Sequence, residues 1–161
     1  MSKKQSVLFV CTGNRARSQM GEGLLRYMAG GRFDVNGAGI DPSGLANQTI
    51  EVMAEIGIDV SGQRSQHVDE FVGKRFDYVI TVCDDAREEC PVFPGSDQIH
   101  WSVEDPTDTY ERGGTLIEAF RVARDELRRR IEGFVRDVDV PVSRRSGFGG
   151  PARRKGCRHT G

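Results

Sequence analysis

A single cysteine stands at the end of a short apolar run, and an arginine follows it six positions later. The stretch VLFVCTGNRARSQ runs from Val7 to Gln19 and contains this pair as Cys11 and Arg17. A cysteine thiolate is a strong nucleophile. The planar guanidinium of arginine can hold two oxygens of one anion. Together, the two residue types predict nucleophilic attack on a bound oxyanion.

The residues that follow the cysteine are of types that form a tight anion-binding loop. Gly13 and Asn14 tolerate left-handed backbone conformations, so the loop N–H groups can point inward around a tetrahedral anion. A helix starting behind the loop is expected to lower the pKa of the Cys11 thiol, with hydrogen bonds from the hydroxyls of Thr12 and Ser18. The predicted oxyanion-binding loop consists of Thr12, Gly13, Asn14, Arg15, Ala16, Arg17 and Ser18.

Three further cysteines lie later in the chain, at Cys83, Cys90 and Cys157. Thiols in a reducing compartment are more often catalytic or redox-active than part of a structural disulfide framework. If the segment from Cys83 to Cys90 is helical, the two lie about 10.5 Å apart along the axis. A disulfide needs Cα atoms within roughly 4.4–6.8 Å. The pair can therefore bond only if the segment unwinds, and the spacing alone leaves open two unrelated buried thiols.

The elements that must position these residues alternate between strands and helices. Apolar and β-branched runs predict strands over residues 7–10, 33–40, 78–83 and 98–103. Helical periodicity predicts helices over residues 18–30, 46–57, 67–72 and 116–134. This alternation is typical of an α/β fold with a four-stranded parallel sheet and helices on both faces. Ligands bind beyond the carboxyl ends of such strands, where Cys11 and Cys83 both fall.

Length and composition predict one domain with a short appendage. The 161 residues, of which 37% are hydrophobic, suit a single core. We expect a domain over residues 1–139 and a basic, disordered tail over residues 140–161, which has no apolar periodicity. From Ser143 onward there are six basic residues and no acidic ones. Because the whole chain has a net charge of −1, the residues before Ser143 carry a net charge of −7. An acidic body argues against nucleic-acid binding.

Membrane and metal association are not expected. No apolar run approaches the roughly 20 residues of a membrane helix, and the N-terminal apolar run is too short for a secretory signal. We therefore expect a cytoplasmic protein. The cysteine spacings fit no CxxC zinc pattern, and the histidines do not cluster near them, so no metal is predicted. His100 and Trp101 are expected to pack and orient the segment that follows them.

Three segments carry a resemblance to a known family. VLFVCTGNRARSQM resembles the oxyanion loop of the low-molecular-weight tyrosine phosphatase superfamily, and CTGN and RSQM are most similar to its thioredoxin-coupled arsenate reductase branch. TVCDDAREECPVFPG and HWSVEDPTD resemble the resolving-cysteine segment and the acid loop of that branch. The resemblance covers about residues 5–136 and implies the same four-stranded fold.

The resemblance also implies a set of roles. Cys11 attacks arsenate that Arg17 and the loop hold, and Asp105 protonates the departing oxygen. Cys83 then attacks Cys11 and releases arsenite, and Cys90 resolves the Cys11–Cys83 disulfide. Thioredoxin is the implied electron donor, with glutaredoxin left open, and no cofactor is needed because the thiols supply both electrons.

Two other functions compete with this one. A phosphatase acting on phosphotyrosine or a small phosphoester needs the same loop and acid, but it leaves Cys83 and Cys90 without a task. That branch usually has aromatic residues after the Asp-Pro pair, whereas this chain has Thr107 and Asp108. An oxidation sensor or partner-binding protein built on the same thiols leaves the arginine and the acid unexplained.

Some relatives bind potassium beside the oxyanion loop through polar and acidic residues. Asn14 and Glu22 match that pattern, whereas Gly37 and Gln66 stand where further oxygen ligands are expected. The resemblance therefore does not lead us to predict a potassium site.

Overall fold

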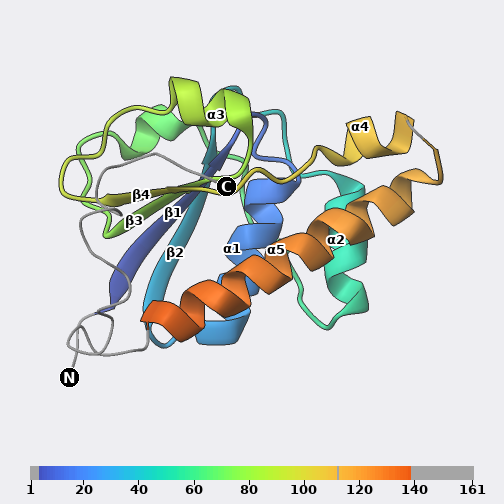
Figure 1. The fold of residues 1–161 in the computed structure, drawn as a ribbon, viewed down its shortest axis with the longest axis horizontal. Helices are drawn as coiled ribbons and strands as arrows, with labels where there is room; N and C mark the ends of the chain where they lie inside the picture. The colour runs from blue at the N-terminus through green and yellow to red at the C-terminus, as the bar shows by residue number, and fades with distance from the viewer. Residues whose placement is uncertain (1–3, 112, 139–161) are drawn as a thin grey trace.

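The computed structural model describes residues 4–111 and 113–138. In this part of the chain, four parallel strands form one sheet with the order β2-β1-β3-β4 (Figure 1). The strands are β1 (Gln5–Cys11), β2 (Phe33–Gly39), β3 (Tyr78–Thr81) and β4 (Asp97–His100). The predicted four-stranded parallel sheet is confirmed. The predicted tail and the domain boundary at residue 139 lie outside the described residues.

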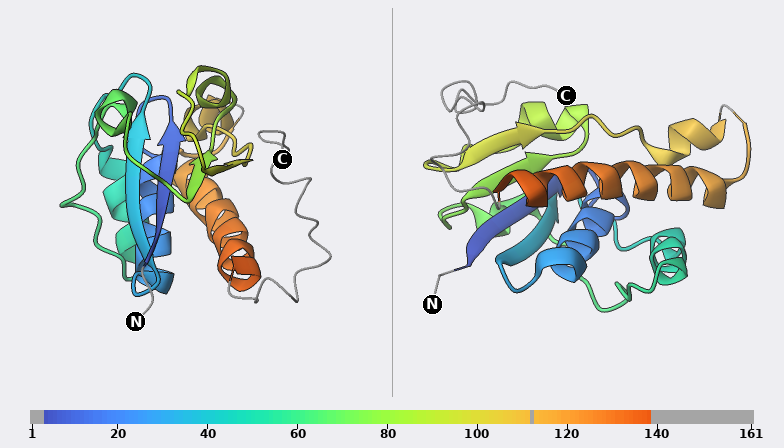
Figure 2. Two further views of the ribbon diagram at one scale, coloured as in Figure 1. Left: turned by 90° about the vertical axis from the view of Figure 1, so that its left-hand side faces the viewer. Right: turned by 60° about the horizontal axis from the view of Figure 1, so that its bottom comes forward.

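Helices cover both faces of the sheet, as the sequence predicts. They are α1 (Arg17–Ala29), α2 (Asn47–Glu55), the 3-10 helix η1 (Val68–Phe71), α3 (Asp84–Glu89), α4 (Pro106–Glu111) and α5 (Leu116–Val138). Figures 1 and 2 show α1 and α5 on one side of the sheet and α3 on the other. Because all strands run in parallel, their carboxyl ends meet at one edge, where β1 leads into the predicted oxyanion loop and β3 leads toward α3.

The core is centred on β1, whose residues Val7–Val10 are completely buried. Gly21 lets α1 approach this strand, because a Cβ at that position would lie 2.9 Å from the ring of Phe9. Trp101 packs in the same layer, with ring centroids 6.3 Å from both Phe9 and Phe134. Trp101 is therefore a partly buried residue that packs against the core, as predicted, and it does not line the pockets described below.

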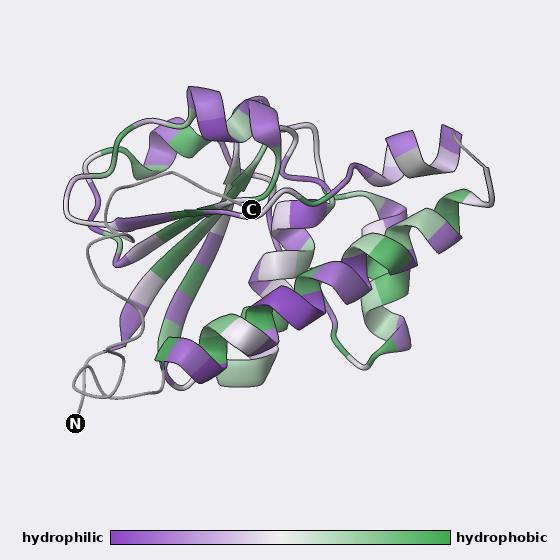
Figure 3. Ribbon diagram, in the orientation of Figure 1, coloured by the Kyte–Doolittle hydropathy of each residue, from purple (hydrophilic) through white to green (hydrophobic). Residues whose placement is uncertain are grey.

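Hydropathy follows this layering (Figure 3). The central strands are hydrophobic over most of their length, and α5 alternates between hydrophobic and hydrophilic turns, as an amphipathic surface helix does. Within the described ranges, no helix combines the length and apolarity needed to cross a bilayer.

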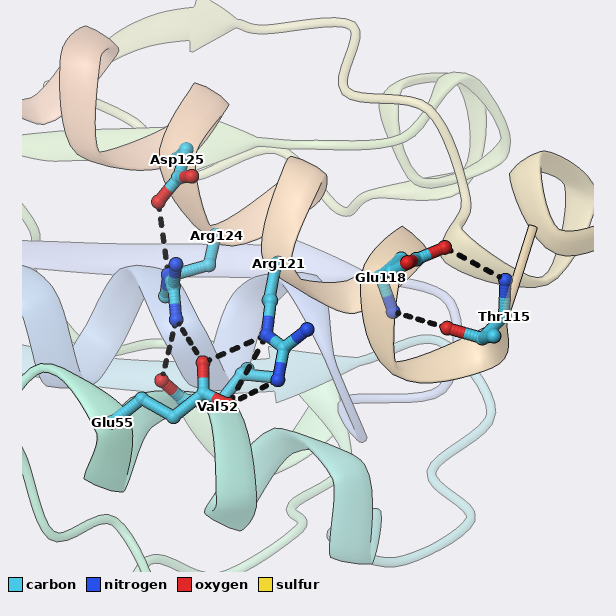
Figure 4. Close-up of polar contacts among 7 residues, drawn as sticks. All are labelled: Val52, Glu55, Thr115, Glu118, Arg121, Arg124 and Asp125. Atoms are coloured by element: carbon cyan, nitrogen blue, oxygen red, sulfur yellow. Dashed lines mark hydrogen bonds and ion pairs between the residues drawn. The ribbon is translucent and has the colours of Figure 1, made fainter.

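A cluster of charged side chains clamps α2 against α5 (Figure 4). Arg121 donates from Nε and Nη2 to both carboxylate oxygens of Glu55, and Arg124 donates from Nη1 to Glu55 Oε1 (2.8 Å) and to the carbonyl of Val52 (2.9 Å). Hydrogen bonds from the two arginines lower the pKa of Glu55 to about 2. This clamp matters for the site because the N-terminal end of α2 contacts the oxyanion loop.

Several element boundaries differ by a few residues from the sequence prediction, and two of the differences lie beside the site. The third and fourth strands end at Thr81 and His100, earlier than predicted, because the chain turns there into α3 and toward α4. The short helix α4 is not predicted at all. Its signal is the Asp105–Pro106 pair: the Asp105 carboxylate accepts from the N–H of Thr107 (2.9 Å), as an N-cap does, and proline favours the first helical position.

Candidate active site

The carbonyl groups of the oxyanion loop face outward, toward residues 41–46. The hydrogen bonds run from Asp41 N to Thr12 O (2.8 Å), from Ser43 N to Gly13 O (2.9 Å) and from Ala46 N to Arg15 O (3.1 Å). In a planar trans peptide the N–H points away from the C=O of the same unit. The N–H groups of these peptides are therefore turned into the loop, where they can surround an oxyanion.

Asn14 holds the loop in this shape. It is fully buried and adopts a left-handed conformation with φ of 46°, whereas Gly13 does not. Its Oδ1 accepts from the Gln66 N–H (2.8 Å), and its Nδ2 donates to Ser18 Oγ (2.7 Å). Its own N–H donates to Cys11 Sγ (3.2 Å). One asparagine thus fixes both the bend of the loop and the surroundings of the sulfur.

Cys11 lies at the bottom of the loop and is almost completely buried. Ser18 Oγ is 2.9 Å from its Sγ, as the sequence predicts. The predicted direction of its pKa is wrong, however: burial raises the pKa of the Cys11 thiol, although hydrogen bonds from Ser18 and the charge of Arg17 oppose that rise. Because solvent does not stabilise the thiolate here, its formation depends on these neighbouring groups.

Arg17 and Asp105 lie together at the mouth of the loop. Arg17 donates from Nη1 to the carbonyl of Val103 (2.8 Å) and from Nη2 to Asp105 Oδ2 (3.2 Å). The arginine side chain is 12% exposed, and that of Asp105 is 42% exposed. The predicted clamp and the predicted acid are therefore paired with each other at the mouth of the loop.

Two adjoining hollows meet at these residues. One, of about 330 Å³, is lined by Cys11 and the oxyanion loop. The other, of about 500 Å³, is lined by Cys83 and by a group of carboxylates. Both are also lined by Thr12, Arg17 and Asp105, so the first and second cysteines open onto neighbouring spaces.

Thr12 links the loop to the second cysteine. The sequence predicts that its hydroxyl contacts Cys11, but in the structure Thr12 Oγ1 lies 3.2 Å from Cys83 Sγ. Cys83 is buried and stands immediately before α3, with extended backbone angles. The carboxyl ends of β1 and β3 therefore bring the two thiol-bearing segments together, as their places in the predicted sheet imply.

Cys90 stands at the other end of α3 and is half-buried. The intervening segment is helical, with hydrogen bonds from Arg87 N to Cys83 O (3.1 Å) and from Cys90 N to Ala86 O (2.9 Å). Cys11, Cys83 and Cys90 are all in the thiol form. Helix geometry puts Cys83 and Cys90 about 10.5 Å apart along the axis. Cys157 lies outside the described residues.

Sequence reasoning missed one interaction beside this segment. His100 is buried, and its Nε2 lies 2.9 Å from Asp84 Oδ1, while Thr81 Oγ1 lies 2.8 Å from its Nδ1. The His100 hydrogen bond lowers the pKa of Asp84. No spacing rule relates residues 16 positions apart on a strand and a helix, so only the fold brings them together.

The residues near Glu22 fit a potassium ion poorly. Glu22 Oε1 is buried without a hydrogen-bond partner, and a Cβ at Gly37 would lie 2.8 Å from it. The other carboxylate oxygen accepts from Arg26 (2.7 Å), and Asn14 Oδ1 is engaged by Gln66. One orphaned oxygen beside a guanidinium is less than a hard cation requires. In the described part of the chain, no group of three or more acidic, cysteine or histidine side chains is arranged to hold a metal.

A parallel four-stranded sheet with a cysteine–arginine loop at its carboxyl edge defines a phosphatase-like class of protein. The profile of the family named low molecular weight phosphotyrosine protein phosphatase matches residues 6–144, and the chain belongs to that family. An arsenate reductase of Staphylococcus xylosus is 39% identical over 132 residues, which are 81% of this chain and 96% of that protein.

Solved structures agree with this placement. An arsenate reductase in a phosphate-binding state superposes with a TM-score of 0.71 at 31% identity, covering 81% of this chain and 96% of the other. A thioredoxin-dependent arsenate reductase of Corynebacterium glutamicum superposes with a TM-score of 0.68 at 28% identity, covering 86% of this chain and 63% of that one.

Proposed function

We propose that this protein is an arsenate reductase that works through a cascade of three cysteines and is regenerated by thioredoxin. The observation that carries the proposal is the contact between Thr12 and Cys83, because it places a second thiol beside the oxyanion loop. The similarity to arsenate reductases, one of them thioredoxin-dependent, supports the substrate and the electron donor.

In the first step, the Cys11 thiolate attacks arsenate held by the loop N–H groups. Arg17 binds two arsenate oxygens, and the Asp105 carboxyl group faces the departing oxygen. Asp105, as the general acid, gives a proton to that hydroxyl oxygen, which leaves as water as the sulfur–arsenic bond forms. Preorganised N–H groups stabilise the charge that builds up on the other oxygens.

In the second step, Cys83 attacks Cys11 Sγ. A sulfur–sulfur bond forms, the sulfur–arsenic bond breaks, and its electron pair goes to arsenic, which leaves as arsenite. Cys90 then attacks Cys83 and frees Cys11 as a thiolate, and the dithiol of thioredoxin reduces the Cys83–Cys90 disulfide by the same exchange chemistry.

Phosphoester hydrolysis is the second candidate activity. Family membership and the grouping of Cys11, Arg17 and Asp105 at one pocket support it. This reaction needs neither Cys83 nor Cys90. Hydrolysis of a chromogenic phosphoester should therefore persist in Cys83→Ser and Cys90→Ser if the site performs it.

The test is disulfide mapping by mass spectrometry after one equivalent of arsenate. Cys90→Ser should release one equivalent of arsenite and then trap a Cys11–Cys83 disulfide. Cys83→Ser should form neither disulfide and release no arsenite beyond background, and Cys157→Ser serves as the matched control. Wild-type protein that hydrolyses phosphoesters but never accumulates a Cys83–Cys90 bond would make the phosphatase the correct assignment.

The electron donor is tested in a multiple-turnover assay. Arsenite production should require thioredoxin, thioredoxin reductase and NADPH. A parallel arm with glutathione and glutaredoxin should support little turnover, and equal turnover in that arm would contradict the thioredoxin assignment.

A further inference from the structure

His100 is a buried group that none of the proposed chemical steps uses. Its side chain is 2% exposed, and both ring nitrogens have partners. A carboxylate only accepts hydrogen bonds, so Nε2 carries a proton and donates to Asp84. Nδ1 lies 2.8 Å from the hydroxyl of Thr81. The ring is therefore held in one orientation by contacts at both of its nitrogens.

These contacts tie together three elements at one point. Thr81 is the last residue of β3, His100 is the last residue of β4, and Asp84 is the first residue of α3. Ser102 Oγ adds a longer contact of 3.4 Å to the same oxygen of Asp84. Hydrogen bonds to the side chain of Asp84 thus connect the end of the sheet to the start of α3.

The other contacts at the first turn of α3 are made by Cys83, which lies beside Thr12 (3.2 Å), and by the buried Ala86. Cys83, which occupies the N-cap position, makes no side-chain capping hydrogen bond, and Ala86 is the buried residue of the helix. A Cys83–Cys90 disulfide requires Cα atoms within roughly 6.8 Å, against about 10.5 Å along a helix of this length. Asp84 directly follows Cys83, so a rearrangement that unwinds the first turn of α3 moves the Asp84 backbone relative to β4.

We propose that the His100–Asp84 hydrogen bond is a latch that holds α3 in its helical dithiol form and opens when Cys90 attacks Cys83. The inference rests on the proposed cascade. In the exchange step, the Cys83–Cys90 bond forms and the Cys11–Cys83 bond breaks. Cys11 leaves with the electron pair and takes up the equivalent of the proton that Cys90 lost. Asp84 and His100 touch no reacting sulfur and are positioning residues.

The latch has a thermodynamic consequence. A contact made only in the dithiol form stabilises that form and raises the reduction potential of the Cys83–Cys90 pair. The disulfide is then easier for an external dithiol to reduce, which favours regeneration. Without the latch, the pair is oxidised more readily and reduced less readily.

The test measures the midpoint reduction potential of the Cys83–Cys90 pair. The protein is the full chain with Cys11→Ser and Cys157→Ser, so that Cys83 and Cys90 are the remaining thiols. The protein is equilibrated in reduced and oxidised dithiothreitol, and the thiols are counted by mass after alkylation. Asp84→Ala should shift the equilibrium toward the disulfide by about threefold to tenfold, or about 15–30 mV toward more negative potential.

Two further variants make the test specific. Asp85→Ala removes another first-turn carboxylate of α3 and is expected to shift the equilibrium less than half as far. Asp84→Asn keeps an acceptor oxygen for His100 and should restore most of the wild-type midpoint. Hydrogen exchange of the reduced protein should be faster at residues 84–90 in Asp84→Ala than in Asp85→Ala.

The outcomes separate the latch from the cascade. Equal midpoints for Asp84→Ala and Asp85→Ala would overturn the latch and leave the cascade standing. Failure of the pair to form a disulfide at any ratio of oxidised to reduced dithiothreitol would overturn the cascade, and the latch with it.

Discussion

The oxyanion loop and the α3 segment lie side by side at the same edge of the sheet, yet they are built in opposite ways. The loop is held through its backbone carbonyls, and its residue Asn14 is fully buried, with hydrogen bonds at both side-chain atoms, Oδ1 and Nδ2. The α3 segment is a short helix with one buried residue, Ala86, and exposed charged residues over most of its length.

This difference matches the chemistry proposed for each region. Attack on an oxyanion benefits from N–H groups that are already in place, because no reorganisation is then needed in the transition state. Exchange between Cys83 and Cys90 needs the reverse, since the two sulfurs meet only after the helix opens. The loop is thus fixed by many buried hydrogen bonds, whereas α3 is a short helix with one buried residue, a feature typical of segments that open locally.

The largest effect is expected from Cys11→Ser. Arsenate reduction should fall to background, because a serine hydroxyl stays protonated in this buried site and cannot enter disulfide exchange. Cys83 and Cys90 should still oxidise to a disulfide in the variant, which would show that the two regions work separately. Arsenite production is the measurement, with Cys157→Ser as a control that keeps its rate. Turnover by Cys11→Ser at even a tenth of that control would refute the role of the loop.

Asp105→Asn is expected to slow formation of the thiol–arsenate adduct by about 10²–10⁴-fold, the usual loss for a general acid. Single-turnover arsenite release measures this step. The reduction potential of the Cys83–Cys90 pair should stay unchanged, because Asp105 is held by Arg17 and by the first turn of α4. A full single-turnover rate would mean that another group supplies the proton.

Asn14→Ala should lower the free energy of unfolding by about 3 kcal/mol, from lost buried hydrogen bonds and a left-handed conformation that alanine disfavours. Glu88→Ala, on the exposed side of α3, should change it by less than about 0.5 kcal/mol. Urea denaturation of both variants is the measurement. Similar losses in the two would erase the contrast in rigidity between the loop and α3.

The sequence predicts the parts of this molecule that depend on local pattern. The apolar run before Cys11 and the periodicity of α5 each concern neighbouring residues, and the fold bears out the strand and the helix they predict. The helix considered as one possibility between Cys83 and Cys90 is present as α3. The contact between Ser18 and Cys11 is also predictable, because the two residues stand at the two ends of the same short loop.

What the sequence does not predict depends on contacts between distant segments. The Thr12 hydroxyl turns to Cys83 because β3 runs beside β1, and Arg17 turns to Asp105 because the acid loop folds over the pocket. The pKa of Cys11 is raised because burial removes the thiol from water, and the Ser18 hydrogen bonds and the charge of Arg17 do not offset that effect. The pairing of His100 likewise needs the sheet order to be known.

The smallest effect concerns the support behind the loop, and it can be followed with pH. Glu55 is joined to Arg121 and Arg124 of α5, and at its N-terminal end α2 holds the loop, since Thr49 Oγ1 donates to the carbonyl of Arg15 (2.8 Å). The pKa of Glu55 is lowered to about 2 in the folded protein, against about 4.3 for an unperturbed glutamate.

A carboxylate whose pKa is lowered by folding stabilises the folded state above its unfolded pKa. That contribution is lost as the pH falls from about 4.3 toward about 2. Glu55→Gln should therefore be less stable than wild type at pH 7, and the difference should shrink as the pH falls through this window. Glu51→Gln, an exposed change on the same helix, should show little difference at any pH. Urea denaturation between pH 7 and pH 2 measures both, and a Glu55→Gln deficit that stays constant across the window would show that the clamp does not depend on the charge of Glu55.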